Sequence, residues 1–163
     1  MIPKFVTFHE RLEDFAFLGV EHVLTENSDF GKYWERFFEL GGYDKIAPFA
    51  KDAQPLNIWY TNDTGTKIFF QGLMVKESTH VPTGFSLVAF PEGDYLVVTY
   101  EWVSADEFQM MEEIDAGWKY LEDLEIPKGY VRHEGAGITL MEKENTETPA
   151  GSRYEFWVPI KKG

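Results

Sequence analysis

The chain has 163 residues, no cysteine and a formal net charge of −13. Nucleic acids and anionic membrane surfaces bind basic faces, and the 15 lysines and arginines form no dense run, so we expect neither partner. Without cysteine, disulfides and thiolate metal sites are excluded. No apolar signal region and no run of about 18 apolar residues is present, which predicts a cytoplasmic protein.

Aromatic side chains make up 17% of the chain, which is a high share. Two interpretations are open. The rings form an aromatic-rich core, or some of them line a ligand cavity, because such cavities are mostly apolar and aromatic.

The first half of the chain predicts a strand, a helix and a hairpin. Residues 14–24 are strand-like. A helix begins at the capping residues 27–29, carries apolar residues at a spacing of three to four, and ends at Gly41 and Gly42. A turn-rich link then joins strand-like residues 56–60 to residues 67–75.

The second half repeats this order. Ser104 and Glu107 form a capping box that predicts the start of the second helix, which ends before Pro127. An apolar stripe runs along that helix, and its acidic outer face, which includes Glu113, is predicted to be solvated. The strand-like runs of this half are residues 85–90, 94–102, 136–143 and 154–160.

Strand, helix, strand, strand therefore occurs twice. We predict one α+β domain over residues 1–163, with repeats at about 5–80 and 84–162. Neither half buries its sheet easily alone, so pairing of the halves is expected.

The usual catalytic and cofactor motifs are absent from the sequence. It contains no phosphate-binding loop, dinucleotide fingerprint, nucleophile elbow or zinc-protease motif. The four histidines show no ligand spacing. We therefore expect no cofactor and no metal.

Carboxylates inside apolar strands are the most informative polar residues. Alternation within residues 136–143 places Ile138, Leu140 and Glu142 on one face. Glu142 either reaches solvent at a strand end or lies in a pocket, where burial would raise its pKa. Beside aromatic rings it could receive a lipophilic cation or act as a general acid or base.

Two further glutamates allow the same choice between surface and site. Glu101 lies between Tyr100 and Trp102 at the end of a strand, and Glu155 shares a strand face with Trp157. Each is interpreted first as an edge or surface residue and second as a site residue.

Several motifs in order resemble the GyrI-like family, also called the AraC-type effector-binding domain. They are FFQGLMV at residues 69–75, VPTGF at 81–85, PEGDYLVVTY at 91–100 and YEFWVPIK at 154–161. The resemblance covers nearly the whole chain, from about residue 5 to 162.

This resemblance implies a duplicated β-α-β-β fold with a ligand groove between the repeats. In multidrug-responsive regulators of the family, aromatic side chains and a buried glutamate receive lipophilic cations. By position, Glu142 matches that glutamate, and Tyr154 and Phe156 match ligand-facing aromatic positions. The remaining candidate ligand-binding residues are Phe70, Tyr100, Trp102, Trp34 and Glu155.

Two departures from the family pattern matter. The chain has no room for the helix-turn-helix domain of the regulators, so direct binding to DNA is not expected. Trp102 stands where many relatives have glycine, and it would reshape one end of the groove.

Three functions follow as hypotheses. The first is a stand-alone binding module for aromatic, lipophilic and cationic small molecules. The second is a GyrI-like hydrolase of strained natural products that uses Glu142 on water. The third is a protein-interaction module with a protein partner, as in gyrase inhibition.

Overall fold

The structure is a computed structural model that describes residues 3–76, 80–133 and 137–163. Its helices are α1 (Phe30–Glu39), α2 (Gly42–Ile46), the short 3-10 helix η1 (Ala47–Phe49) and α3 (Met110–Glu122). Its strands are β1 (Phe5–Leu12), β2 (Phe15–Val23), β3 (Leu56–Thr61), β4 (Lys67–Val75), β5 (Ser86–Phe90), β6 (Gly93–Tyr100), β7 (Tyr130–Arg132), β8 (Ile138–Thr148) and β9 (Gly151–Lys162). Within these residues, no helix is long and apolar enough to cross a bilayer.

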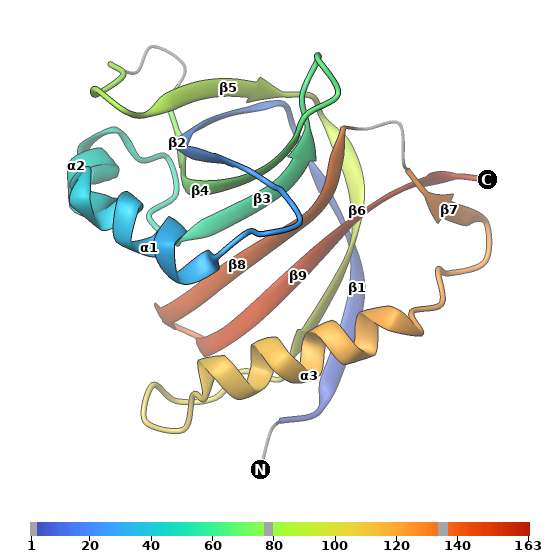
Figure 1. The fold of residues 1–163 in the computed structure, drawn as a ribbon. Helices are drawn as coiled ribbons and strands as arrows, with labels where there is room; N and C mark the ends of the chain where they lie inside the picture. The colour runs from blue at the N-terminus through green and yellow to red at the C-terminus, as the bar shows by residue number, and fades with distance from the viewer. Residues whose placement is uncertain (1–2, 77–79, 134–136) are drawn as a thin grey trace.

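The nine strands of the described residues form one antiparallel sheet, which confirms the predicted α+β class (Figure 1). The order is β1-β6-β9-β8-β3-β4-β2-β5, with β7 beside β9. The first strand of each half pairs with the second strand of the other half, β1 with β6 and β5 with β2. A third pairing between the halves, β3 with β8, lies at the centre of the sheet.

The helices cover one face of the sheet, which we call the helical face (Figure 1). α1 and α2 pack on β2 and β4 around Phe37, Ile46 and Leu73. α3 packs on β6, β8 and β9 around Val98 and Phe156. A third cluster fills the opposite face, which no helix of the described residues covers. Among its members are Phe17, Phe70, Phe90, Tyr95 and Trp157.

α3 lies unusually close to the sheet because of a glycine. A Cβ on Gly117 would come within 2.1 Å of the ring of Phe156. The missing side chain therefore lets the helix rest directly on β9 and fixes the position of its other side chains.

One strand was not predicted, and one predicted helix start was wrong. β1 was not predicted as a strand, since most of its residues are exposed and its partner β6 lies far along the chain. The predicted capping box does not start α3. The backbone amides of Glu107 and Phe108 both donate to the carbonyl of Ser104 and close a turn, and the helix begins later, at Met110.

The predicted alternation of β8 holds only in part. The register between β3 and β8 shifts at Trp59 and Tyr60, which face Leu140 and Ile138 and leave Thr139 without a partner. Such a bulge moves the residues before it to the other face. Ile138 consequently lies in the helix-free cluster, so its predicted placement beside Glu142 was wrong. Residue 136, where the strand was predicted to start, lies outside the described residues.

Candidate functional site

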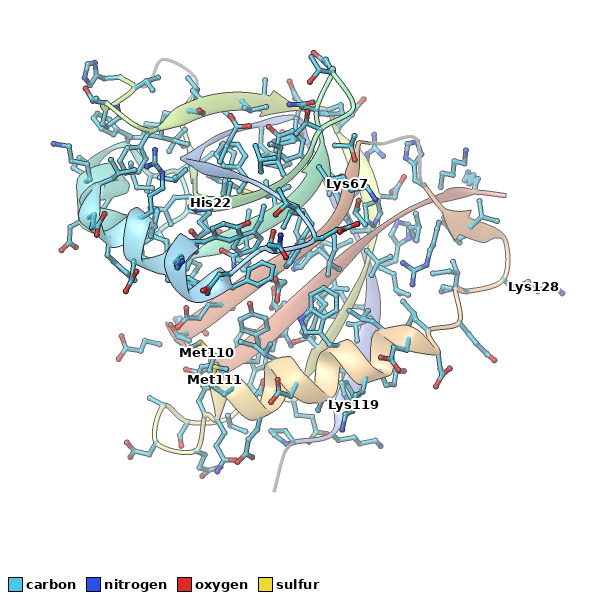
Figure 2. All side chains as sticks on the ribbon, in the orientation of Figure 1. His22, Lys67, Met110, Met111, Lys119 and Lys128 are labelled. Atoms are coloured by element: carbon cyan, nitrogen blue, oxygen red, sulfur yellow. The ribbon has the colours of Figure 1, made fainter. Side chains whose placement is uncertain are left out.

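A cavity of about 410 Å³ opens on the helical face, between the helices of the two halves. β3 and β8 form its floor, since they lie at the centre of the sheet. Figure 2 shows Met110 and Met111 at the start of α3, on the side towards α1. The apolar lining is mainly aromatic and comes from both halves: Phe30, Trp34, Trp59, Phe69, Ile114 and Trp118.

Glu142 is the central polar residue of this cavity. Its side chain is 5% exposed, and its oxygens accept hydrogen bonds from Trp59 Nε1 at 2.7 Å and from the Tyr154 hydroxyl at 3.1 Å. Within the described residues it takes part in no ion pair. Burial raises the pKa of Glu142, and the hydrogen bonds from Trp59, Tyr154 and Trp118 partly oppose this rise.

The strands on either side of β8 hold this carboxylate in place. Trp59 comes from β3 and Tyr154 from β9, and both project to the helical face beside Glu142. Tyr154 is itself buried, and burial together with the neighbouring Glu142 raises its pKa. The hydroxyl is thus a neutral donor, so it orients the carboxylate without neutralising its charge.

Three more polar residues line the cavity. Glu144 lies two residues after Glu142 on the same strand, and burial raises its pKa. Asn57 is the cross-strand partner of Glu142 on β3. Tyr43 comes from α2, and its pKa is raised by burial and by the charge of Glu144.

The structure brings three of the eight predicted ligand-binding residues into this cavity, Trp34, Glu142 and Tyr154. Phe156 lies close by but is buried beneath α3, with its ring centroid 6.0 Å from that of Trp118. Phe70 lies in the cluster on the opposite face of the sheet.

The remaining predicted residues are placed elsewhere. Tyr100 is buried and donates its hydroxyl hydrogen bond to the carbonyl of Glu113. Trp102 packs on the guanidinium of Arg153, 3.9 Å from ring centroid to Cζ. Glu155 accepts hydrogen bonds from Arg153 and from Trp157, with which it was predicted to share a face. Glu101 is exposed.

Glu113 was predicted to lie on a solvated face, and this was wrong. It is fully buried, and its Oε1 accepts a hydrogen bond from the backbone amide of Tyr154 at 3.0 Å. Its pKa is raised by burial. The position follows from the helical period, because Glu113 lies one turn before Gly117, where α3 approaches β9 most closely.

Several cavity residues were not predicted, among them Trp59, Phe69 and Trp118. A signal was present for Trp59. Asn57 is a polar residue inside an apolar strand, and alternation places Trp59 on its face. The cross-strand position of Phe69 beside Trp59 depends on hairpin register, which the turn sequence alone did not define.

Residues 10–160 match the family of integron-associated effector-binding proteins, and the chain therefore belongs to that family. The structure of SAV2435 bound to tetraphenylphosphonium is similar, with a TM-score of 0.66 and 11% identity over 96% of this chain and 94% of that one. The C-terminal domain of EcmrR is also similar, with a TM-score of 0.58 and 9% identity over 98% of this chain and 99% of that one. An integron cassette protein from the mobile metagenome of Vibrio cholerae has a TM-score of 0.56 and 11% identity, over 95% of both chains. No match was found among curated proteins.

At these identities the solved structures establish the fold. Together with the family match, they confirm the GyrI-like resemblance that the sequence motifs indicated.

Proposed function

We propose that the protein binds a lipophilic aromatic cation in the cavity, with Glu142 as its counter-charge. One observation carries this proposal: the Glu142 carboxylate is buried among aromatic rings and has no ion-pair partner in the described part of the chain. An ionised carboxylate without a compensating cation is costly to bury. A bound cation would compensate the charge of Glu142 and remove that cost. The free energy gained in this way would strengthen ligand binding.

The cavity walls favour cations of a particular kind. The faces of Trp34, Trp59 and Trp118 carry negative charge density and attract a cation placed over them. Met110 and Met111 are flexible and polarisable, and they adapt to ligands of different shape. Such walls reward large apolar surface around the charge, and the net charge of −13 draws cations towards the protein.

The comparisons support the same ligand class. The family is described as effector-binding, and SAV2435 was solved with tetraphenylphosphonium, which carries one positive charge within four aromatic rings.

Hydrolysis is the competing use of the same carboxylate. A general base must take a proton from water, and hydrogen bonds to its ionised form oppose this. Trp59 and Tyr154 donate such bonds to both oxygens of Glu142. These bonds only partly oppose the effect of burial, which raises the pKa of Glu142, so the carboxylate keeps the ability to accept a proton and the fate of the ligand decides between the two functions.

Titration of the purified protein with tetraphenylphosphonium tests the proposal. Trp34, Trp59 and Trp118 are three of the five tryptophans and line the cavity, so intrinsic fluorescence reports on binding directly. Glu142→Gln keeps the shape of the side chain and removes its charge. We expect it to weaken binding at least about thirtyfold, or roughly 2 kcal/mol, which is the lower range for loss of a buried charge partner.

Glu39→Gln is the matched control, because Glu39 is exposed on α1 and its substitution removes the same charge. It should leave the affinity within about twofold, which is the scatter expected for a surface position. Equal affinity in wild type and Glu142→Gln would refute the proposal. Mass spectrometry of the recovered ligand should find it intact, and its consumption would favour hydrolysis instead.

A further inference from the structure

We propose that Glu144 forms a second cation subsite in the same cavity, and that the preferred ligands are therefore flat aromatic dications. This proposal rests on the proposed function of Glu142 and names the ligand class more narrowly.

Strand geometry sets the distance between the two carboxylates. Glu142 and Glu144 are alternate residues of β8, they line the same cavity, and a strand rises about 3.3 Å per residue. Their backbone positions are therefore about 6.6 Å apart on one face. This spacing is close to the separation of the two charges in a rigid two-ring dication.

The positive residue between them does not neutralise either carboxylate. Lys143 projects to the other face of the sheet, where its Nζ lies 2.8 Å from Oδ2 of Asp52. In the described residues, the Glu144 side chain makes no ion pair and accepts no hydrogen bond. Glu144 thus adds a second uncompensated charge to the cavity.

Unpartnered polar groups occur around the same carboxylates. Asn57 is 8% exposed and lines the cavity as the cross-strand partner of Glu142, yet its Oδ1 has no hydrogen-bond partner among the described residues. The hydroxyl of Tyr43, next to Glu144, is likewise buried and unpartnered in that part of the chain. Buried polar groups are rarely left unpaired in native proteins. Of the four such side-chain atoms in the described residues, these two oxygens belong to cavity-lining residues, where they can face the positive charge of a bound ligand.

A monocation leaves one of the two carboxylates uncompensated. Two like charges at this distance repel, and the repulsion increases as the cavity excludes water. A dication compensates both carboxylates at once. Its second charge should therefore strengthen binding, although it also requires more dehydration.

A pair of probes with the same two-ring shape isolates this effect. 1-Methyl-4-phenylpyridinium carries one charge, and 1,1′-dimethyl-4,4′-bipyridinium carries two. We expect the wild-type protein to bind the dication at least about tenfold more tightly, the difference produced by one favourable charge contact in a partly buried site. Calorimetric titration measures both affinities under identical salt.

Glu144→Gln should abolish the preference for the dication, while Glu39→Gln, at an exposed position outside the cavity, should retain it. A preference that survives Glu144→Gln would show general attraction by the acidic protein and would overturn the proposal. Absence of any preference in the wild type, including failure of both probes to bind, would overturn it as well. If tetraphenylphosphonium also fails to bind, the proposed function is refuted along with it.

Discussion

Two buried glutamates on neighbouring strands lie on opposite faces of the sheet and have opposite surroundings. Glu155 on β9 is 2% exposed, and its carboxylate accepts hydrogen bonds from Arg153 at 2.8 Å and from Asn145 and Trp157 at 3.1 Å. Glu142 on β8 is 5% exposed and accepts hydrogen bonds from uncharged donors only, in the part of the chain that the structure describes.

This difference in surroundings gives the two carboxylates different roles: the charge of Glu155 is structural, and the charge of Glu142 is available to a ligand. Arg153 compensates Glu155 within the chain, and its guanidinium also packs on Trp102, so nothing is left for an external partner. Glu142 has the same degree of burial without the internal cation, and a cavity lies above it. Burial alone therefore does not identify a binding residue. Glu142 combines burial without an internal cation with a cavity lined by its carboxylate, whereas the fully buried Glu113 lines no part of that cavity.

The largest expected effect is on stability at the compensated carboxylate. Arg153→Met removes the cation and leaves Glu155 buried beside neutral groups, as Glu142 is in the wild type. We expect the free energy of unfolding to fall by about 3 kcal/mol, measured by urea denaturation, because breaking a buried ion pair leaves an uncompensated charge. The affinity for tetraphenylphosphonium should not change.

The double variant Arg153→Met/Glu155→Gln is the control for this prediction. It removes both charges and should recover most of the lost stability, since replacing a buried pair by neutral residues costs far less than breaking it. If the single variant is as stable as wild type, the ion pair contributes little and the contrast between the two faces does not hold.

The next effect is a pH dependence of binding to which Glu142 contributes most. Burial raises the pKa of this carboxyl, and only the ionised form attracts a cation. Affinity for tetraphenylphosphonium should therefore rise with pH, by up to about tenfold per pH unit below that pKa, and level off above it. Calorimetry at several pH values would also detect the proton released on binding.

Stability of the ligand-free protein should change in the opposite sense. A carboxyl whose folded-state pKa is raised contributes stability that is present at low pH and is lost as pH rises through that pKa. Glu142→Gln should weaken both trends, and the remainder should come from Glu113 and Glu144, whose pKa values burial also raises. Parallel pH profiles of affinity in wild type and in this variant would contradict the assignment of the titrating group to Glu142.

The part of the site that could be predicted from the sequence is the part carried by short-range patterns. The helix that begins at Asp29, the hairpin of β3 and β4 and the strand position of Glu142 all follow from capping residues, turn residues and alternation. The resemblance to the GyrI-like family predicted a ligand groove between the halves, with Tyr154 and Trp34 as candidate ligand-binding residues.

The rest depends on contacts between distant segments. The bulge at Thr139 changes which neighbours share a face with Glu142, and no local signal marks it. Glu113 is buried because Gly117 allows α3 to approach β9, a contact about 40 residues away along the chain. Trp118 enters the cavity for the same reason, and Trp102 is held on Arg153 by an interaction that alternation does not reveal.

The smallest predicted effect on ligand affinity distinguishes Trp118 from Trp102. Trp118 lines the cavity, is 39% exposed and contacts the ring of Trp59 at a centroid distance of 5.7 Å. Trp118→Leu should weaken tetraphenylphosphonium binding about fivefold, near 1 kcal/mol, because it removes one aromatic face from the cation. Trp102→Leu should leave the affinity unchanged and lower stability instead, because it removes the ring that packs on Arg153.

Fluorescence titration and urea denaturation of the same two variants measure both quantities. The family resemblance assigned Trp102 to the groove wall, so this pair also tests that assignment. A loss of affinity in Trp102→Leu equal to that in Trp118→Leu would mean that ligand binding involves the end of β6 as well as the cavity. A loss of stability without a loss of affinity would mean that Trp102 has a structural role. Its ring would then support Arg153, the cation that compensates Glu155.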